Sequence, residues 1–169
     1  EYAWVRISDV TRSNGKLQTT TQRLSDEGSS LSVKLRPGEL FLSIAGSVGK
    51  PCVTDIKCCI HDGFVYFPNL TINKKILYYL FEAGKCYGGL GKLGTQLNLN
   101  TDTVGNIKIP VPPKPEQSQI AEFLDKKTTQ FDELIAKSKK QITILEEKRQ
   151  ALITAVVTGK IDVRSETMA

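Results

Sequence analysis

The sequence has few aromatic residues, a single histidine and no long apolar run. Phe, Trp and Tyr make up 7% of its 169 residues, and no segment approaches the roughly eighteen apolar residues of a membrane span. The first residues lack the basic and apolar regions of a secretory signal, so we expect a cytoplasmic protein that does not contact membranes. Because the chain opens without Met, close to a strand-like stretch, we also expect a fragment of a longer protein.

The scarcity of histidine also argues against catalysis. His61 and Asp62 are sequence neighbours, and neighbouring residues on a strand point to opposite faces. No serine or cysteine stands with them in a recognised nucleophile arrangement. We therefore expect no catalytic residue. Methyl transfer would need a cofactor-binding domain for which this chain is too short.

The four cysteines predict no metal site. Cys52, Cys58, Cys59 and His61 follow the spacing C-x5-C-C-x-H, and adjacent cysteines rarely both turn toward one ion. Without a secretory signal, reduced thiols are expected. We interpret these three cysteines and Cys86 as small buried hydrophobes.

Positive charge is concentrated in the N-terminal part. Residues 1–115 carry 14 Lys+Arg against 9 Asp+Glu, whereas residues 116–169 carry 9 of each. A basic surface attracts polyanions such as DNA or RNA. Many proteins that never bind nucleic acid have a similar excess, so charge alone leaves the question open.

The first 115 residues alternate short apolar runs with turn residues, which predicts a β-rich α+β domain. Asn14-Gly15 is a turn dipeptide. Asn73 is expected to cap a helix that extends to Ala83 and is closed by Gly84. A helical turn is expected at residues 101–105, and strands are expected at residues 4–7, 31–35, 40–44, 51–54, 57–60, 63–67 and 107–109.

After the proline cluster at residues 110–115 the period changes. No Gly or Pro occurs from Glu116 to Thr158, which predicts one helix of roughly 64 Å. Polar residues interrupt its heptad pattern at Thr128, Ser138 and Arg149. A helix longer than a small domain cannot cover only its own core, so we expect a coiled coil with a partner helix. The predicted seam consists of Leu124, Phe131, Ile135, Ile142, Leu145, Leu152 and Val156.

Four segments of this sequence resemble the specificity subunits of type I restriction-modification enzymes. These are residues 4–10 (WVRISDV), the glycine segment with LRPGEL at 35–40 and SIAGSVGK at 43–50, the junction IKIPVPP at 107–113 followed by Glu116, Gln117 and Ile120, and the ending EKRQALITAVVTGKID at 147–162. The junction and the ending are the specific signals, and the ending resembles that of a subunit's C-terminal half.

The resemblance implies a DNA target recognition domain at residues 1–113, a long spacer helix at 114–160 in an antiparallel coiled coil, and a tail at 161–169. In this family each recognition domain reads one half of a bipartite double-stranded target. Methyltransferase subunits and a restriction subunit join the complex, and S-adenosylmethionine, ATP and Mg belong to those partners. The second recognition half is either a covalent repeat or a second copy.

The polar segment at residues 11–23, interpreted as a loop, holds the first candidates for DNA contacts, because base reading needs forked or amide groups. Lys50 is a candidate phosphate contact beside the glycines. Tyr87 and Lys92 are a second candidate, in a glycine-rich run that lacks the spacing of a nucleotide-binding loop. An ordinary solvated surface is the alternative for each. The candidates in the polar segment are Arg12, Ser13, Asn14, Lys16, Gln18 and Arg23.

Two other functions remain open from the sequence. A coiled-coil assembly scaffold with a head that does not read sequence would have the same helix. An RNA-binding domain is disfavoured by the few aromatic residues and by the absence of an RNP signature. The target sequence cannot be read from the residues.

Overall fold

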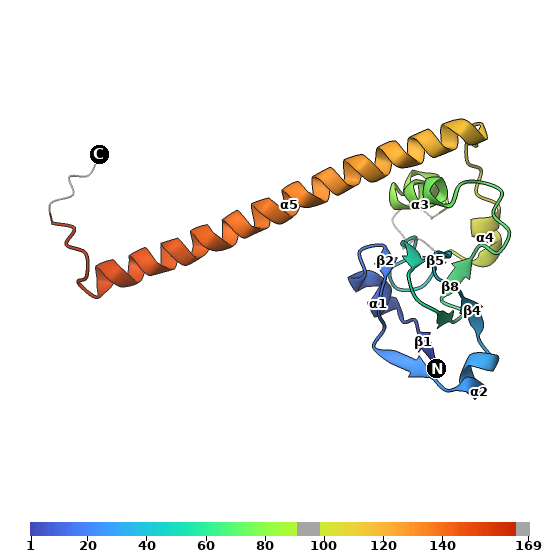
Figure 1. Cartoon of the computed structure of the whole chain (residues 1–169), viewed down its shortest axis with the longest axis horizontal. Coiled ribbons are helices and arrows are strands. Elements are labelled where there is room, and N and C mark those ends of the chain that lie inside the picture. Colours follow the sequence, from blue (N-terminus) through green and yellow to red (C-terminus); the bar gives the residue numbers. More distant parts are fainter. Residues whose placement is uncertain (91–98, 165–169) are drawn as a thin grey trace. The chain divides into compact units, whose positions relative to one another are not determined.

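The computed structural model describes residues 1–90 and 99–164, and in these ranges the strands form two four-stranded sheets (Figure 1). The first has the order β3 (Gln22–Leu24), β1 (Tyr2–Trp4), β7 (Cys58–Ile60), β4 (Val33–Leu35). The second has the order β2 (Lys16–Leu17), β6 (Pro51–Thr54), β5 (Leu40–Ser43), β8 (Phe64–Tyr66). The pairs β1–β7 and β2–β6 are parallel and the others antiparallel.

Alternation along β5 generates a layered core. Phe41 packs in one buried cluster with residues of both sheets, including Cys58 of the first. Leu40 and Leu42 belong to a second cluster with Phe81. Because successive side chains of a strand point to opposite faces, the second sheet is covered on one face by the first sheet. Its other face is covered by α3 (Lys74–Glu82) and α4 (Thr101–Gly105).

Most of the expected elements are confirmed. The strands expected at residues 40–44, 51–54, 57–60 and 63–67 are present within a residue or two at each end. Asn73 caps α3 through its side-chain oxygen, which accepts from the Lys75 amide at 2.9 Å. Gly84 ends the helical segment in the left-handed conformation, with φ 69°. The helical turn at residues 101–105 is α4.

Three strand predictions are wrong in whole or part. The first strand ends at Trp4, because the Asp9 carboxylate accepts the Arg6 amide at 3.0 Å and starts α1 (Ile7–Arg12). The strand expected at residues 31–35 begins only at Val33, since Leu31 follows α2 (Asp26–Ser30) and is 86% exposed. Residues 107–109 form no strand, and their two isoleucines pack against the second buried cluster.

The long helix is present as α5 (Lys114–Val157), 44 residues or about 66 Å in length. It begins where the spacer helix implied by the resemblance starts, two residues before the start expected from the stretch without Gly or Pro. Gln117 is buried there: its side-chain oxygen accepts from the Asn73 amide at 2.7 Å, and its side-chain nitrogen donates to the Pro112 carbonyl at 2.8 Å. No helix among the described residues, α5 included, combines the length and apolarity needed to cross a membrane.

The chain divides into two compact units, Glu1–Ala121 and Glu122–Ala169. The first contains both sheets and the beginning of α5. The described part of the second is the remainder of α5 followed by a short segment after Gly159, which ends the helix with φ 74°.

Candidate nucleic-acid interface

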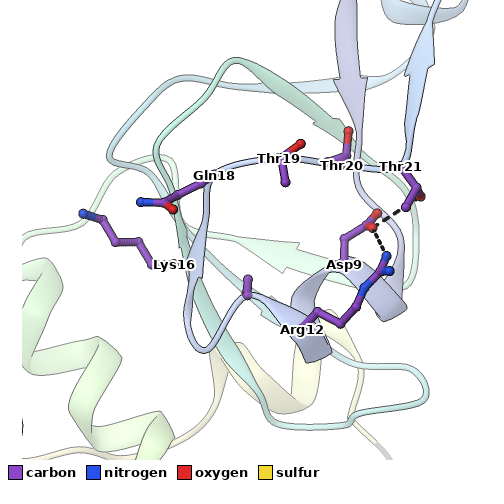
Figure 2. Close-up of a pocket in the computed structure, with 8 residues that line it drawn as sticks. Asp9, Arg12, Lys16, Gln18, Thr19, Thr20 and Thr21 are labelled. Atoms are coloured by element: carbon purple, nitrogen blue, oxygen red, sulfur yellow. Dashed lines mark hydrogen bonds and ion pairs between the residues drawn. The ribbon is translucent and has the colours of Figure 1, made fainter. Parts of the chain in front are cut away.

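The C-terminal end of α1 and the segment that follows it enclose a pocket of ≈ 470 Å³ (Figure 2). Arg12, Ser13, Lys16 and Gln18, all predicted DNA contacts, lie together in its wall. The remaining lining residues were not singled out from the sequence: Asp9, Thr19, Thr20 and Thr21.

The Asp9 carboxylate organises this pocket. Its side chain is only 2% exposed, whereas that of Arg12 is 64% exposed. Besides the Arg6 amide, the carboxylate accepts from Arg12 Nη2 at 2.8 Å and from the Thr21 hydroxyl at 3.3 Å. Figure 2 shows both of these side chains directed at it. A buried carboxylate needs such partners, and they fix the Arg12 guanidinium against the helix.

The segment at residues 11–23 is not one loop, contrary to the sequence interpretation. Its first two residues end α1, Lys16–Leu17 is β2, and its last two residues begin β3. Leu17 is fully buried and pairs with Thr54 of β6, so the segment is held to the second sheet at its middle. Lys16 Nζ lies 3.2 Å from Asp55 Oδ2, and Gln18 Nε2 lies 3.4 Å from the same oxygen.

The glycine segment at residues 44–50 joins β5 to β6 and contacts the end of α1. Lys50 Nζ donates to the Thr11 carbonyl at 3.2 Å, and the hydroxyl oxygens of Thr11 and Ser47 lie 2.8 Å apart. Gly49 has φ 81°, and a Cβ there would lie 2.9 Å from Tyr87 Cε2. The segment therefore requires glycine at this position, and it holds Lys50 beside the helix that carries Arg12.

Tyr87 packs against the glycine segment at Gly49. Its hydroxyl donates to the Gly49 carbonyl at 2.9 Å, and its ring stacks on Phe81 with centroids 6.0 Å apart. Burial raises the pKa of Tyr87, so the hydroxyl stays protonated and keeps donating. The hydroxyl is therefore already engaged within the protein. The predicted contact of Tyr87 with DNA remains a prediction. Lys92 lies outside the described residues.

The other predicted contacts occupy different surroundings. Asn14 is exposed at the tip of the predicted turn, with φ 49°. The Ser13 hydroxyl donates inward, to the Val10 carbonyl at 2.9 Å. Arg23 is exposed on β3 and does not line the pocket at α1. One sequence signal could have found Asp9: acidic and basic residues spaced by three, at positions 6, 9 and 12, are typical of a capped, ion-paired helical turn.

Three of the four cysteines are buried as interpreted. Cys52, Cys58 and Cys59 are inaccessible and Cys86 is half-buried. Burial raises the pKa of Cys52 and of Cys58 to about 11. Among the described residues, no three His, Cys, Asp or Glu side chains are grouped as metal ligands would be.

The expectation that His61 and Asp62 do not face one another is wrong. His61 Nδ1 lies 3.3 Å from Asp62 Oδ1, because Asp62 lies in the turn after β7 and not on a strand. The Gly63 amide donates to the same ring nitrogen at 2.9 Å. The pair therefore stabilises a turn.

Residues 1–144 match the family described as type I restriction modification DNA specificity domain, and the chain belongs to this family. The resemblance to these specificity subunits is thereby confirmed over residues 1–144, which include the proline junction, whereas the ending at residues 147–162 lies outside the match. The structure confirms the α+β fold with a long C-terminal helix.

The chain is also similar to individual proteins. The chain is 29% identical over 131 residues to the type I restriction enzyme MjaVIII specificity subunit of Methanocaldococcus jannaschii, covering 76% of this chain and 29% of the relative. A solved structure from work on complex assembly and conformational transition of the type I R-M system has a TM-score of 0.61 at 25% identity, over 72% of this chain and 31% of that one. The HsdS subunit from Thermoanaerobacter tengcongensis has a TM-score of 0.44 at 27% identity, over 57% and 23%. The chain spans less than a third of each relative.

Proposed function

We propose that this chain reads one half of a bipartite double-stranded DNA target within a type I restriction-modification complex. The observation that supports the proposal is the convergence of Arg12, Lys16, Gln18 and Lys50 around the end of α1. These four side chains come from three separate segments of a domain whose family is named for DNA specificity.

The chemistry of these groups suits DNA. A guanidinium and an amide can each make paired hydrogen bonds to base edges, and lysine ammonium groups neutralise phosphates. Arg12 and Gln18 are therefore the proposed base contacts, and Lys16 and Lys50 the proposed phosphate contacts. Asn14 and Arg23 are also exposed in the segment at residues 11–23 and remain proposed contacts to either bases or phosphates.

The exposed seam of α5 supports a spacer role. Phe131, Ile135, Ile142, Leu145 and Leu152 are each between 51% and 63% exposed. Apolar side chains at this spacing are stabilised when a second helix covers them. We propose that α5 pairs antiparallel with a matching helix, from a second recognition half or a second copy, and thereby sets the distance between half-sites.

In this proposal the chain contributes recognition but no chemistry. Methyl transfer and cleavage belong to methyltransferase and restriction subunits, which bring S-adenosylmethionine, ATP and Mg. The binding energy that directs those subunits to one sequence comes from the contacts around α1.

A competition experiment tests the proposal. The protein, assembled with the methyltransferase subunit of its own system, is bound to labelled target duplex and challenged with unlabelled duplex DNA or structured RNA. We expect only duplex DNA of the right sequence to compete strongly. Lys50→Ala should weaken binding to all sequences and lower the salt dependence by about one unit, whereas Arg36→Ala, an exposed arginine outside the pocket, should do neither. Complete indifference to DNA would instead identify a scaffold.

A further inference from the structure

The Arg12 guanidinium is occupied along one edge. Nε donates to the Ser8 carbonyl at 3.2 Å and Nη2 donates to Asp9 Oδ1 at 2.8 Å. These two nitrogens form one side of the planar group. The end of the group consists of Nη1 and the second hydrogen of Nη2, which together form a free edge with two parallel N–H groups. Among the described residues, no hydrogen bond or salt bridge uses Nη1.

We propose that this free edge of Arg12 recognises guanine in one half-site and that Asp9 is the positioning residue that aims it. The proposal rests on the proposed function and names the group that is read. Guanine presents two acceptors, O6 and N7, in the major groove, and their spacing matches two parallel N–H donors. Adenine, cytosine and thymine present no such pair of acceptors.

Fixation of the side chain favours base reading. An arginine that is free in solution loses rotamer freedom when it binds, and this loss lowers its affinity for the ligand. Arg12 is already held by two hydrogen bonds, although most of its side chain is exposed. Its direction is therefore set before DNA arrives, as a geometric test of a base requires.

Charge distinguishes guanine from phosphate as the ligand. A phosphate contact depends on net positive charge and tolerates many orientations. The Asp9 carboxylate, 2.8 Å from Nη2, offsets much of the Arg12 charge, so the pair attracts phosphate less than a free arginine would. Lys50 donates to a backbone carbonyl, and the Asp55 carboxylate that pairs with Lys16 at 3.2 Å is 35% exposed and therefore more strongly screened by solvent than Asp9. Both lysines are therefore better placed to neutralise phosphates. The two parallel N–H groups of Arg12, in contrast, keep their geometry whatever the net charge of the pair.

The test uses the protein with its methyltransferase subunit and its own target, first established by mapping methylated sites. Each guanine of the half-sites is replaced in turn by 7-deazaguanine, which pairs normally but lacks N7. We expect one position at which the unaltered protein loses about tenfold in affinity, the value of one hydrogen bond to a charged group. Replacing that base pair entirely should cost about 5- to 150-fold.

Two variants assign this loss to the Arg12 edge. Arg12→Lys keeps the charge but replaces two fixed parallel donors with a flexible ammonium group, so its sensitivity to 7-deazaguanine at that position should fall while it binds non-target DNA within about twofold of the unaltered protein. Asp9→Asn removes the carboxylate charge, so discrimination should fall while affinity for non-target DNA stays equal or rises. A purely structural defect would lower both affinities. Arg36→Ala, the matched control, should change neither.

The outcomes separate the two proposals. Equal losses on target and non-target DNA for Arg12→Lys, or unchanged sensitivity to 7-deazaguanine, would overturn the guanine assignment and leave the proposed function standing. If the unaltered protein shows no sequence preference, both proposals fail. Should Asp9→Asn lower the melting temperature, Arg12→Lys alone decides, because the Arg12 side chain is largely exposed.

Discussion

Shortening α5 by one heptad is expected to change the spacing of the DNA target. Deletion of residues 138–144 removes two turns of a coiled-coil helix and restores the seam, because Leu145 then follows Ile135 at the spacing that Ser138 had. At 1.5 Å per residue the helix loses about 10.5 Å. With a rise of about 3.4 Å per base pair, the preferred spacer should shrink by roughly three base pairs when both paired helices are shortened.

The deletion should leave the half-site sequence unchanged, since no residue around α1 is touched. Three base pairs also rotate one half-site by about 100°, given 10 to 10.5 base pairs per turn. The shortened protein should therefore bind its new target more weakly than the unaltered protein binds the old one. Selection of preferred duplexes from a library with variable spacers, or mapping of methylated sites, measures both quantities.

A second deletion provides the control. Removal of residues 141–144 breaks the seven-residue repeat and locally distorts the coiled coil, so it should weaken helix pairing and bipartite recognition more than the seven-residue deletion does. An unchanged spacer in the seven-residue deletion, with activity retained, would refute the idea that α5 measures distance. The same result would not contradict the proposed DNA contacts around α1.

Three further predictions concern stability. Gln117→Ala should lower the free energy of unfolding by about 1–3 kcal/mol in urea titrations, because it leaves the half-buried Asn73 amide and Pro112 carbonyl without their partner; an unchanged midpoint would show that these two hydrogen bonds contribute nothing. Gly49→Ala should lower the free energy of unfolding by about 1–3 kcal/mol, because the residue has a positive φ and its Cβ would approach the Tyr87 ring. The control Gly105→Ala, with no atom within 4 Å of the added Cβ, should be neutral or stabilise by up to about 1 kcal/mol. Equal effects of the two substitutions would contradict the strain argument. Because burial raises the pKa of Cys52 and Cys58 from 9.0 to about 11, the unfolded state loses these protons first, so stability should fall as the pH rises from about 9 to about 11. The urea midpoint of the unaltered protein should fall more steeply across this pH range than that of the Cys52→Ala variant. Equal pH dependence in the two proteins would exclude the effect.

The layers of the fold follow from patterns that the sequence shows directly. Short apolar runs bounded by turn residues predict β5 and β6, and the cap at Asn73 predicts α3, because each depends on neighbours within a few residues. The absence of Gly and Pro after Glu116 predicts α5 almost to its ends. The pairing order of the strands had no such local signal, since it depends on which distant segments meet.

The candidate site was predictable only in part. Arg12, Lys16 and Gln18 were found because their residue types suit DNA, without knowledge of their conformation. Asp9 was missed because α1 has six residues and its apolar neighbours look like a continued strand. β2 was missed because two residues show no alternation, and only pairing with β6 reveals it.

The contacts at α1 also determine how specificity can change. Lys16 and Gln18 face outward, so their replacement alters the groups offered to DNA without disturbing either sheet. Arg12 differs, because its replacement by an uncharged residue removes the cationic partner of the buried Asp9 carboxylate, whereas Arg12→Lys keeps the charge. A change of base preference that replaces Arg12 with an uncharged residue therefore calls for a paired substitution of Asp9. The double variant should be more stable than the sum of the two single effects predicts, and this excess stability measures the coupling directly.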